Sequence, residues 1–278
     1  MRMITGFFII IRPLNCLITF IVIIVSGLIC TNDNHISIKL LLAGLVGFII
    51  TAAGNSINDI IDVDIDRINR PHRPLPSLRL TLKQAWVLFL LLVTTSLVLS
   101  LFINLFAFLI VLLSNALLIL YSLSIKRVPV FGNIVISFLT AYAFIFGGMV
   151  VENVNGAFIP AVFAFLINLI REVIKDMEDT KGDKLAGVNT LPIKYGINAS
   201  KYFVLVVSSI LFLFSFVPFL FHIYEIEFFL IIMIIVNPLL VYVVKLLFED
   251  VSKQNLGKVS ALLKLNMIFG LIAIYIGK

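Results

Sequence analysis

Residues 84–125 read QAWVLFLLLVTTSLVLSLFINLFAFLIVLLSNALLILYSLSI and contain no Asp, Glu, Lys or Arg. As a single helix this run would be about 63 Å long, about twice the hydrocarbon core of a bilayer. It is therefore expected to cross a membrane twice. Asn104, near its middle, marks the predicted turn.

The composition of the whole chain agrees with a membrane protein. Of 278 residues, 61% are hydrophobic and only 13% charged, and the mean hydropathy is +1.16. These values leave too few polar side chains to cover a soluble globule, which excludes soluble enzyme folds. Cys16 and Cys30 lie in the first apolar run without metal-ligand spacing, so we expect reduced packing residues. The other uncharged runs are 13–32, 40–58, 128–151, 153–170, 202–224, 228–244 and 265–277, the last extended back to Val259.

These runs predict an all-α protein of nine transmembrane helices, with its termini on opposite sides. In this topology every basic residue except Lys39 and Lys278 falls on one side of the membrane. The positive-inside rule makes that side cytoplasmic, which places the amino terminus inside and the carboxyl terminus outside.

Two acidic segments, 55–66 and 172–183, end the predicted second and sixth helices with the same spacing. If helical, each set lies on one polar stripe within about 60°. Gly182 is expected to end the helix of the second segment early and leave Asp183 on a loop. The members of the two sets are Asn55, Asp59, Asp62 and Asp66, and Glu172, Asp176, Asp179 and Asp183.

Such acids repel one another unless a cation lies between them. Oxygen ligands without Cys or His favour Mg²⁺. A solvated acidic helix end is the alternative interpretation. The repeat of the spacing favours a functional site within one domain, 1–278, built from two related halves.

Basic residues adjoin these acids and suit phosphate contacts. Arg70 and Arg73 lie in a proline-rich loop after the first segment, and Lys175 lies within the second. Lys126 and Arg127 close the fourth helix, where contact with lipid headgroups is the alternative.

The motifs together resemble a known family. Asn58-Asp59-x-x-Asp62-x-x-x-Asp66, followed by Asn69-Arg70-Pro71-x-Arg73-Pro74-Leu75-Pro76-Ser77, and Lys175-Asp176-x-x-Asp179-x-x-Gly182-Asp183 resemble the UbiA superfamily of intramembrane prenyltransferases. The resemblance implies a U-shaped bundle around a central cavity, in which Mg²⁺ holds the diphosphate of a polyprenyl donor.

The resemblance also implies roles for individual residues. The metal ligands would be Asn58, Asp59, Asp62, Asp66, Glu172, Asp176, Asp179 and Asp183, of which Glu172 is the least secure. The residues essential for transfer would be Asp62, Asp66, Asp179, Asp183 and Lys126. The substrate-binding residues would be Arg12, Asn15, Asn58, Arg67, Arg70, Arg73, Tyr121, Lys126, Arg127 and Lys175.

Within the family, two segments are similar to archaeal members that build a glycerol diether phosphate. These are Arg12-Pro13-x-Asn15 and Tyr121-Ser122-x-x-x-Lys126-Arg127-x-Pro129-x-x-Gly132-Asn133. The similarity implies geranylgeranyl diphosphate as donor and the sn-2 hydroxyl of geranylgeranylglyceryl phosphate as acceptor.

Two alternatives stay open at this point. One is an aromatic acceptor such as 4-hydroxybenzoate, and a more remote one is a membrane transporter. The expected location is the cell membrane, with the site facing the cytoplasm and no nucleic-acid partner. The sequence decides neither the donor chain length nor the oligomeric state.

Overall fold

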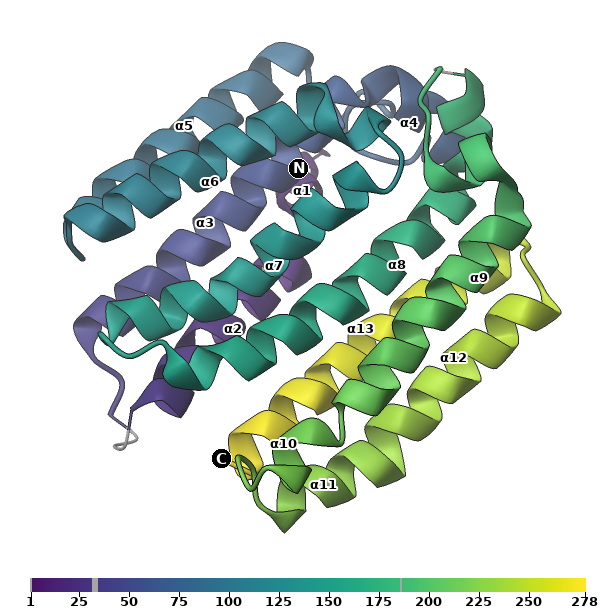
Figure 1. Ribbon diagram of the computed structural model, residues 1–278. Coiled ribbons are helices and arrows are strands. Elements are labelled where there is room, and N and C mark those ends of the chain that lie inside the picture. Colours follow the sequence, from purple (N-terminus) through teal and green to yellow (C-terminus); the bar gives the residue numbers. More distant parts are fainter. Residues whose placement is uncertain (1, 32–34, 186) are drawn as a thin grey trace. The chain divides into compact units, whose positions relative to one another are not determined.

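The structure, a computed structural model, describes residues 2–31, 35–185 and 187–278 (Figure 1). In these ranges all regular secondary structure is helical, and nine helices are long and apolar enough to cross a membrane. The predicted number of spanning helices is therefore confirmed for the part of the chain that is described.

The helices follow one another from one end of the chain to the other. The first group is α1 Arg2–Ile11, α2 Pro13–Cys30, α3 Ile38–Ile61, α4 Val63–Asn69, α5 Leu82–Leu101, α6 Leu105–Leu123 and the short 3-10 turn η1 Ile125–Arg127. The middle group is α7 Phe131–Val150, η2 Asn155–Ala157 and α8 Phe158–Leu185. The last group is α9 Leu191–Phe214, α10 Val217–Leu220, α11 Ile226–Ile231, the π-helical turn η3 Ile232–Val236, α12 Asn237–Glu249 and α13 Lys253–Ile276.

The predicted turn within the long apolar run is confirmed. Helix α5 ends at Leu101, and Asn104 caps α6 by accepting a hydrogen bond from the Ala107 amide at 2.7 Å. Elsewhere the helices extend beyond their apolar parts. Helix α13 begins at Lys253, well before Val259, because Ser252 caps it by accepting from the Asn255 amide.

The chain forms two compact units. Unit 1 comprises Met1–Arg127, Tyr142–Ala157 and Lys181–Val188. Within it, α3 packs against α2, α5 and α6 (Figure 1). Gly147, in the part of α7 that belongs to this unit, allows a close approach to α2, since a Cβ there would lie 2.5 Å from the Ile23 carbonyl oxygen. Small residues at such contacts let membrane helices pack closely.

Unit 2 comprises Val128–Ala141, Phe158–Thr180 and Asn189–Lys278. Its core joins α8, α9, α12 and α13 through fully buried side chains such as Ile174, Val204 and Leu263. The π-helical turn precedes Pro238, which has no amide hydrogen to donate. Asn266 Nδ2 of α13 donates a hydrogen bond to the Val236 carbonyl oxygen at 2.8 Å. A side chain therefore supplies a hydrogen-bond donor for this backbone carbonyl of the irregular turn.

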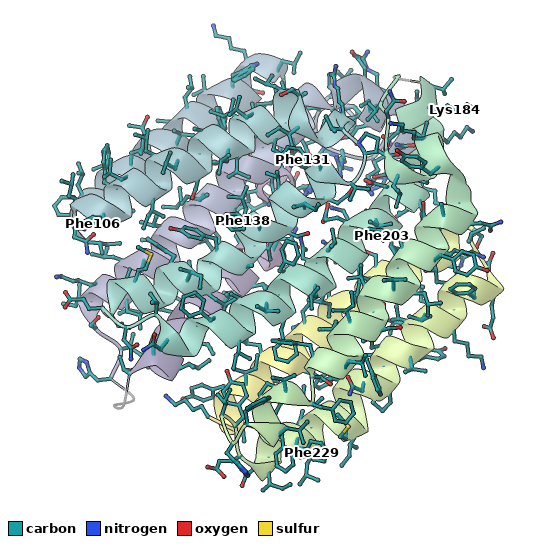
Figure 2. All side chains as sticks on the ribbon, in the orientation of Figure 1. Phe106, Phe131, Phe138, Lys184, Phe203 and Phe229 are labelled. Carbon is teal, nitrogen blue, oxygen red and sulfur yellow. The ribbon has the colours of Figure 1, made fainter. Side chains whose placement is uncertain are left out.

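The outer surfaces of both units are apolar, as a lipid-facing protein requires. Figure 2 shows the side chains on the helices, and the labelled Phe106 and Phe138 are 73% and 54% exposed. Cys16 and Cys30 are buried and are not joined in a disulfide, which agrees with the expectation that they are reduced packing residues.

Candidate active site

The first acidic segment is divided between two helices. Helix α3 ends at Ile61, and Asp62 leaves the helical conformation with φ −92° and ψ 9° before α4 begins at Val63. A polar stripe is expected only if the segment is helical throughout, and the break at Asp62 means that this condition is not met. Asp66 and Asp59 are both buried, at 4% and 2% exposure, although they lie on different helices.

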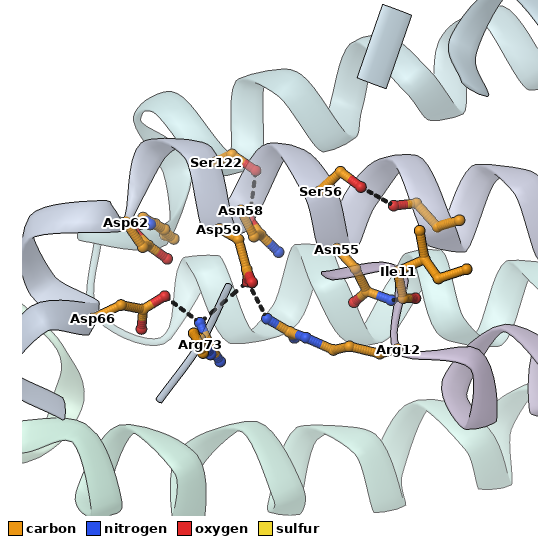
Figure 3. Close-up of polar contacts among 12 residues, drawn as sticks. Ile11, Arg12, Asn55, Ser56, Asn58, Asp59, Asp62, Asp66, Arg73 and Ser122 are labelled. Atoms are coloured by element: carbon orange, nitrogen blue, oxygen red, sulfur yellow. Dashed lines mark hydrogen bonds and ion pairs between the residues drawn. The ribbon is translucent and has the colours of Figure 1, made fainter. Parts of the chain in front are cut away.

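Asp59 is the meeting point of two arginines in unit 1. Its Oδ1 atom accepts a hydrogen bond from Arg12 Nη2 and another, at 3.2 Å, from Arg73 Nη1 (Figure 3). Arg73 Nη1 also donates to Asp66 Oδ2. A buried carboxylate is stable only when its charge is paired in this way. Arg12, Arg73, Asp59 and Asp66 thus form one ionic cluster.

The backbone at the junction of α1 and α2 brings Arg12 to this cluster. Pro13 disfavours helical geometry in the residue before it, and Arg12 adopts a left-handed conformation, φ 52° and ψ 71°. Asn55 Nδ2 donates to the Ile11 carbonyl at 2.8 Å and so ties the end of α1 to α3. Asn55, the first member of the acidic set, therefore helps to fix this junction.

A second group of polar contacts joins α3 to the end of α6. Ser122 Oγ donates to Asn58 Oδ1 (Figure 3), and Lys126 Nζ donates to Asp62 Oδ1. Lys126 lies in η1, directly after α6. The structure therefore brings Lys126 to the first acidic segment, as a phosphate-binding role beside those acids requires.

The environment of Asp66 disfavours its ionised form. Burial raises the pKa of the Asp66 carboxyl to about 6, and the neighbouring charges of Asp59 and Asp62 act in the same direction, while Arg73 opposes them. The carboxyl is still mostly ionised at neutral pH, and a further cation beside it would favour the ionised form more strongly.

The other residues predicted to bind substrate differ in their exposure to solvent. Arg67 points to solvent and pairs with exposed Asp64 at 2.8 Å, and Arg127 is exposed. Asn15, Arg70 and Tyr121 are half-buried.

Gly182 does not end α8, so that prediction is wrong. The helix continues to Leu185, and Gly187, with φ 69°, takes the left-handed position. The Val188 amide donates to the Asp183 carbonyl at 2.9 Å, and the Gly187 amide donates to the Lys184 carbonyl at 3.3 Å. This is the hydrogen-bond pattern with which a glycine one residue past the cap closes a helix. Asp183 is consequently held on the helix.

The second acidic segment lies on α8, and its first two acids have partners in unit 2. Buried Glu172 accepts from Lys175 Nζ at 2.9 Å and from Arg171 Nη1 at 3.2 Å. Asp176 Oδ2 accepts from Asn133 Nδ2 of α7 at 2.8 Å. Asp179 is half-buried.

Arg171 is not among the site residues that the sequence motifs predict. Its Nε atom is buried, and no hydrogen-bond partner for it lies in the part of the chain that the structure describes. Its position directly before Glu172, the first member of the second acidic set, is the feature of the sequence that could have indicated it.

The donor chemistry of the acidic segments fits Mg²⁺, which prefers oxygen ligands. Among residues 2–31, 35–185 and 187–278, no group of three or more His, Cys, Asp or Glu side chains is arranged to hold a metal by itself. Mg²⁺ usually needs only one or two carboxylates, because waters and substrate phosphates complete its coordination. The residues are therefore suited to a metal that arrives with a phosphate-bearing substrate.

Comparisons with known proteins connect this chain to one family. The sequence model of the UbiA prenyltransferase family matches residues 19–268. The digeranylgeranylglyceryl phosphate synthase of Methanosphaera stadtmanae is 36% identical, over 96% of this chain and 97% of its own. The protein of the same name from Methanocaldococcus jannaschii is 39% identical, over 96% and 94%.

Solved structures agree with these sequence similarities. One, from a study of digeranylgeranylglyceryl phosphate synthase in membranes, is 38% identical and superposes with a TM-score of 0.73 over 100% of this chain and 99% of its own. A UbiA homologue from Archaeoglobus fulgidus, bound to GPP and Mg²⁺, is 20% identical, with a TM-score of 0.65 over 97% and 99%. The second similarity concerns the fold alone.

Proposed function

Because this chain belongs to the UbiA prenyltransferase family, we propose that it transfers a geranylgeranyl group between two lipid substrates. The donor is geranylgeranyl diphosphate, and the acceptor is the sn-2 hydroxyl of geranylgeranylglyceryl phosphate. The product is digeranylgeranylglyceryl phosphate. The observation that carries the choice of acceptor is the similarity, along nearly the whole chain, to relatives named for that product.

In the reaction, the bond between C1 of the donor and its diphosphate oxygen breaks. A new ether bond forms between C1 and the acceptor oxygen, and diphosphate and the hydroxyl proton are released. Arg73 and Lys126, held beside the acids of the first segment, are suited to stabilise the negative charge of the departing diphosphate. Arg12 is the third cation of this group.

We propose that Mg²⁺ takes part through the acidic segments. The ligands proposed from the family resemblance are Asn58, Asp62 and Asp66 of the first segment and Asp179 and Asp183 of the second. Bound Mg²⁺ would neutralise part of the diphosphate charge. Asp59, Glu172 and Asp176 also belong to the proposed ligand set, although each accepts hydrogen bonds from neighbouring side chains.

The remaining substrate contacts are proposals of the same kind. Lys175 is suited to phosphate because it is charged and lies on α8 among the acids. The phosphate of the acceptor also requires cations. Candidates for contact with one or the other substrate are Asn15, Arg67, Arg70, Tyr121 and Arg127.

We further propose that the chain lies in the cell membrane with its amino terminus and its site facing the cytoplasm. The distribution of basic residues supports this orientation. The U-shaped bundle around a central cavity and the single domain of two related halves stay predictions of the family resemblance.

The decisive experiment offers the purified protein a choice of acceptors. With Mg²⁺ and geranylgeranyl diphosphate, we expect a diether phosphate from geranylgeranylglyceryl phosphate and no product from 4-hydroxybenzoate. EDTA should stop product formation. Transfer to 4-hydroxybenzoate without diether formation would refute the proposed acceptor.

The proposed metal ligands are tested by Asp62→Ala and Asp179→Ala. Each removes a carboxylate, and we expect turnover to fall by about 100-fold or more, while the protein still inserts into membranes. Product formation and membrane extraction are measured side by side. Full activity in both variants would contradict the metal assignment.

A further inference from the structure

The contact between Asn69 and Gly182 joins the ends of the two acidic segments within unit 1. Asn69 is the last residue of α4, the helix that carries Asp66, and Gly182 directly precedes Asp183 on α8. The Gly182 amide donates to Asn69 Oδ1 at 3.0 Å, and this bond is buried. Two residues separated by more than a hundred positions therefore meet beside the last acid of each segment.

The absence of a side chain at Gly182 is what permits the contact. A Cβ at this position would lie 2.4 Å from Asn69 Nδ2, 2.5 Å from Cγ and 2.6 Å from Oδ1. Asn69 is only 6% exposed, so its amide has little room to move aside. Any larger residue at 182 would displace the amide or separate α4 from α8.

Two alternative reasons for a glycine at 182 are excluded. Helix termination is one, but Gly187 performs that role. A left-handed backbone is the other, but Gly182 is not among the residues with positive φ. A glycine in a helix interior is less favourable than alanine by about 1 kcal/mol, so close approach is the remaining benefit.

We propose that Asn69 and Gly182 are positioning residues that set Asp183 against Asp66 for metal binding. This inference rests on the proposed function, because it assigns both acids to Mg²⁺. Neither Asn69 nor Gly182 need touch metal or substrate. Their contact fixes the spacing of the helix ends on which the two acids lie. Partners that orient metal ligands from outside typically change metal affinity or activity by about 10- to 100-fold when lost.

The first test measures geometry without any assay of activity. Spin labels on cysteines introduced at Asp64 of α4 and Lys184 of α8 report the distance between these helices, since both positions are exposed and the native cysteines are buried. We expect a narrow distance distribution in the parent and a broadened or shifted one after Asn69→Leu. An unchanged distribution would overturn the positioning role.

The second test measures the Mg²⁺ concentration that gives half-maximal activity. We expect Asn69→Leu and Gly182→Ala each to raise it by about 10-fold or more. The two residues act through one contact. The double variant with Asn69→Ala and Gly182→Ala should therefore require the same Mg²⁺ concentration as Asn69→Ala alone. Additive effects, or an unchanged Mg²⁺ requirement in the single variants, would contradict the proposal.

Matched controls separate positioning from stability. Asn115→Leu removes another buried asparagine of unit 1, one that donates to Ser96 Oγ at 3.1 Å, and should lower stability without altering the Mg²⁺ requirement. Gly270→Ala, in α13, adds a methyl group where no atom lies within 4 Å. It should alter neither the stability nor the Mg²⁺ requirement. An equal rise in the Mg²⁺ requirement after Asn115→Leu would show that stability alone is responsible. If the parent forms no prenylated product, the proposed function fails, and the spin-label distances still decide the contact.

Discussion

Asp59 shows how the role of a single carboxylate depends on its neighbours. Its spacing within the first acidic segment places it among the metal ligands. In the structure its Oδ1 atom accepts hydrogen bonds from Arg12 and Arg73, which come from segments on either side of it in the sequence. We infer that Asp59 anchors these two guanidiniums beside Asp66. This role does not depend on contact between Asp59 and Mg²⁺.

Replacing this anchor is predicted to affect stability and donor binding together. Asp59→Asn keeps the size of the side chain but leaves Arg12 and Arg73 without one of their counter-charges. Breaking a buried ion pair typically destabilises by roughly 3 kcal/mol or more. We expect a lower melting temperature in detergent and a higher KM for geranylgeranyl diphosphate.

The control for this variant is Asp64→Asn, the same substitution in the same segment. Asp64 pairs with Arg67 at the surface, where the side chains are 81% and 64% exposed. Exposed pairs contribute less than about 1 kcal/mol, so the melting temperature and KM should stay close to the parent values. Equal effects of the two substitutions would remove the special role of Asp59.

At the scale of helices, capping side chains decide where the elements begin and end. Asn104 begins α6 in the middle of the apolar run, and Ser252 begins α13 well before its apolar part. At the end of α8, Gly187 has the capping conformation, while Gly182 lies within the helix. Sequence alone offers two glycines there and does not say which one the backbone uses.

The cap on α6 gives a prediction at this scale. Asn104→Ala removes the acceptor of the Ala107 amide and should destabilise unit 1 by about 1 kcal/mol. Asn104→Asp keeps an acceptor at the same place and should retain most of the stability. Thermal unfolding in detergent measures both. A parent-like melting temperature for Asn104→Ala would mean that packing alone sets the turn.

For the whole molecule, the placement of charge relative to the bilayer predicts the orientation. All basic residues but Lys39 and Lys278 fall on one side of the predicted topology, the side to which both acidic segments are also assigned. An enzyme that combines a water-soluble metal ion with insoluble lipid chains needs its polar groups at a membrane surface and apolar helices around them. The exposed apolar side chains of both units agree with this requirement.

The orientation can be measured with a membrane-impermeant thiol reagent. Cysteines introduced at Lys184 and Lys278 are both exposed and lie on opposite sides in the proposed topology. In vesicles whose outer surface is the cell exterior, the reagent should label position 278 at once and position 184 only after the membrane is permeabilised. The reverse order of labelling would invert the proposed topology.

The sequence by itself determined the class of fold, the number of spanning helices among the described residues and the turn at Asn104, and it predicted the acidic and basic residues of the candidate site. Hydrophobic length, charge exclusion and capping are local properties, and each can be read from neighbouring residues.

Only the tertiary structure decided which residues meet. Arg12 and Arg73 share Asp59, Lys126 reaches Asp62, and Gly182 packs on Asn69. The break at Asp62, which divides the first acidic segment, also appears only in the structure. Such contacts depend on how side chains of segments far apart in the sequence fit together, and no local spacing encodes that fit.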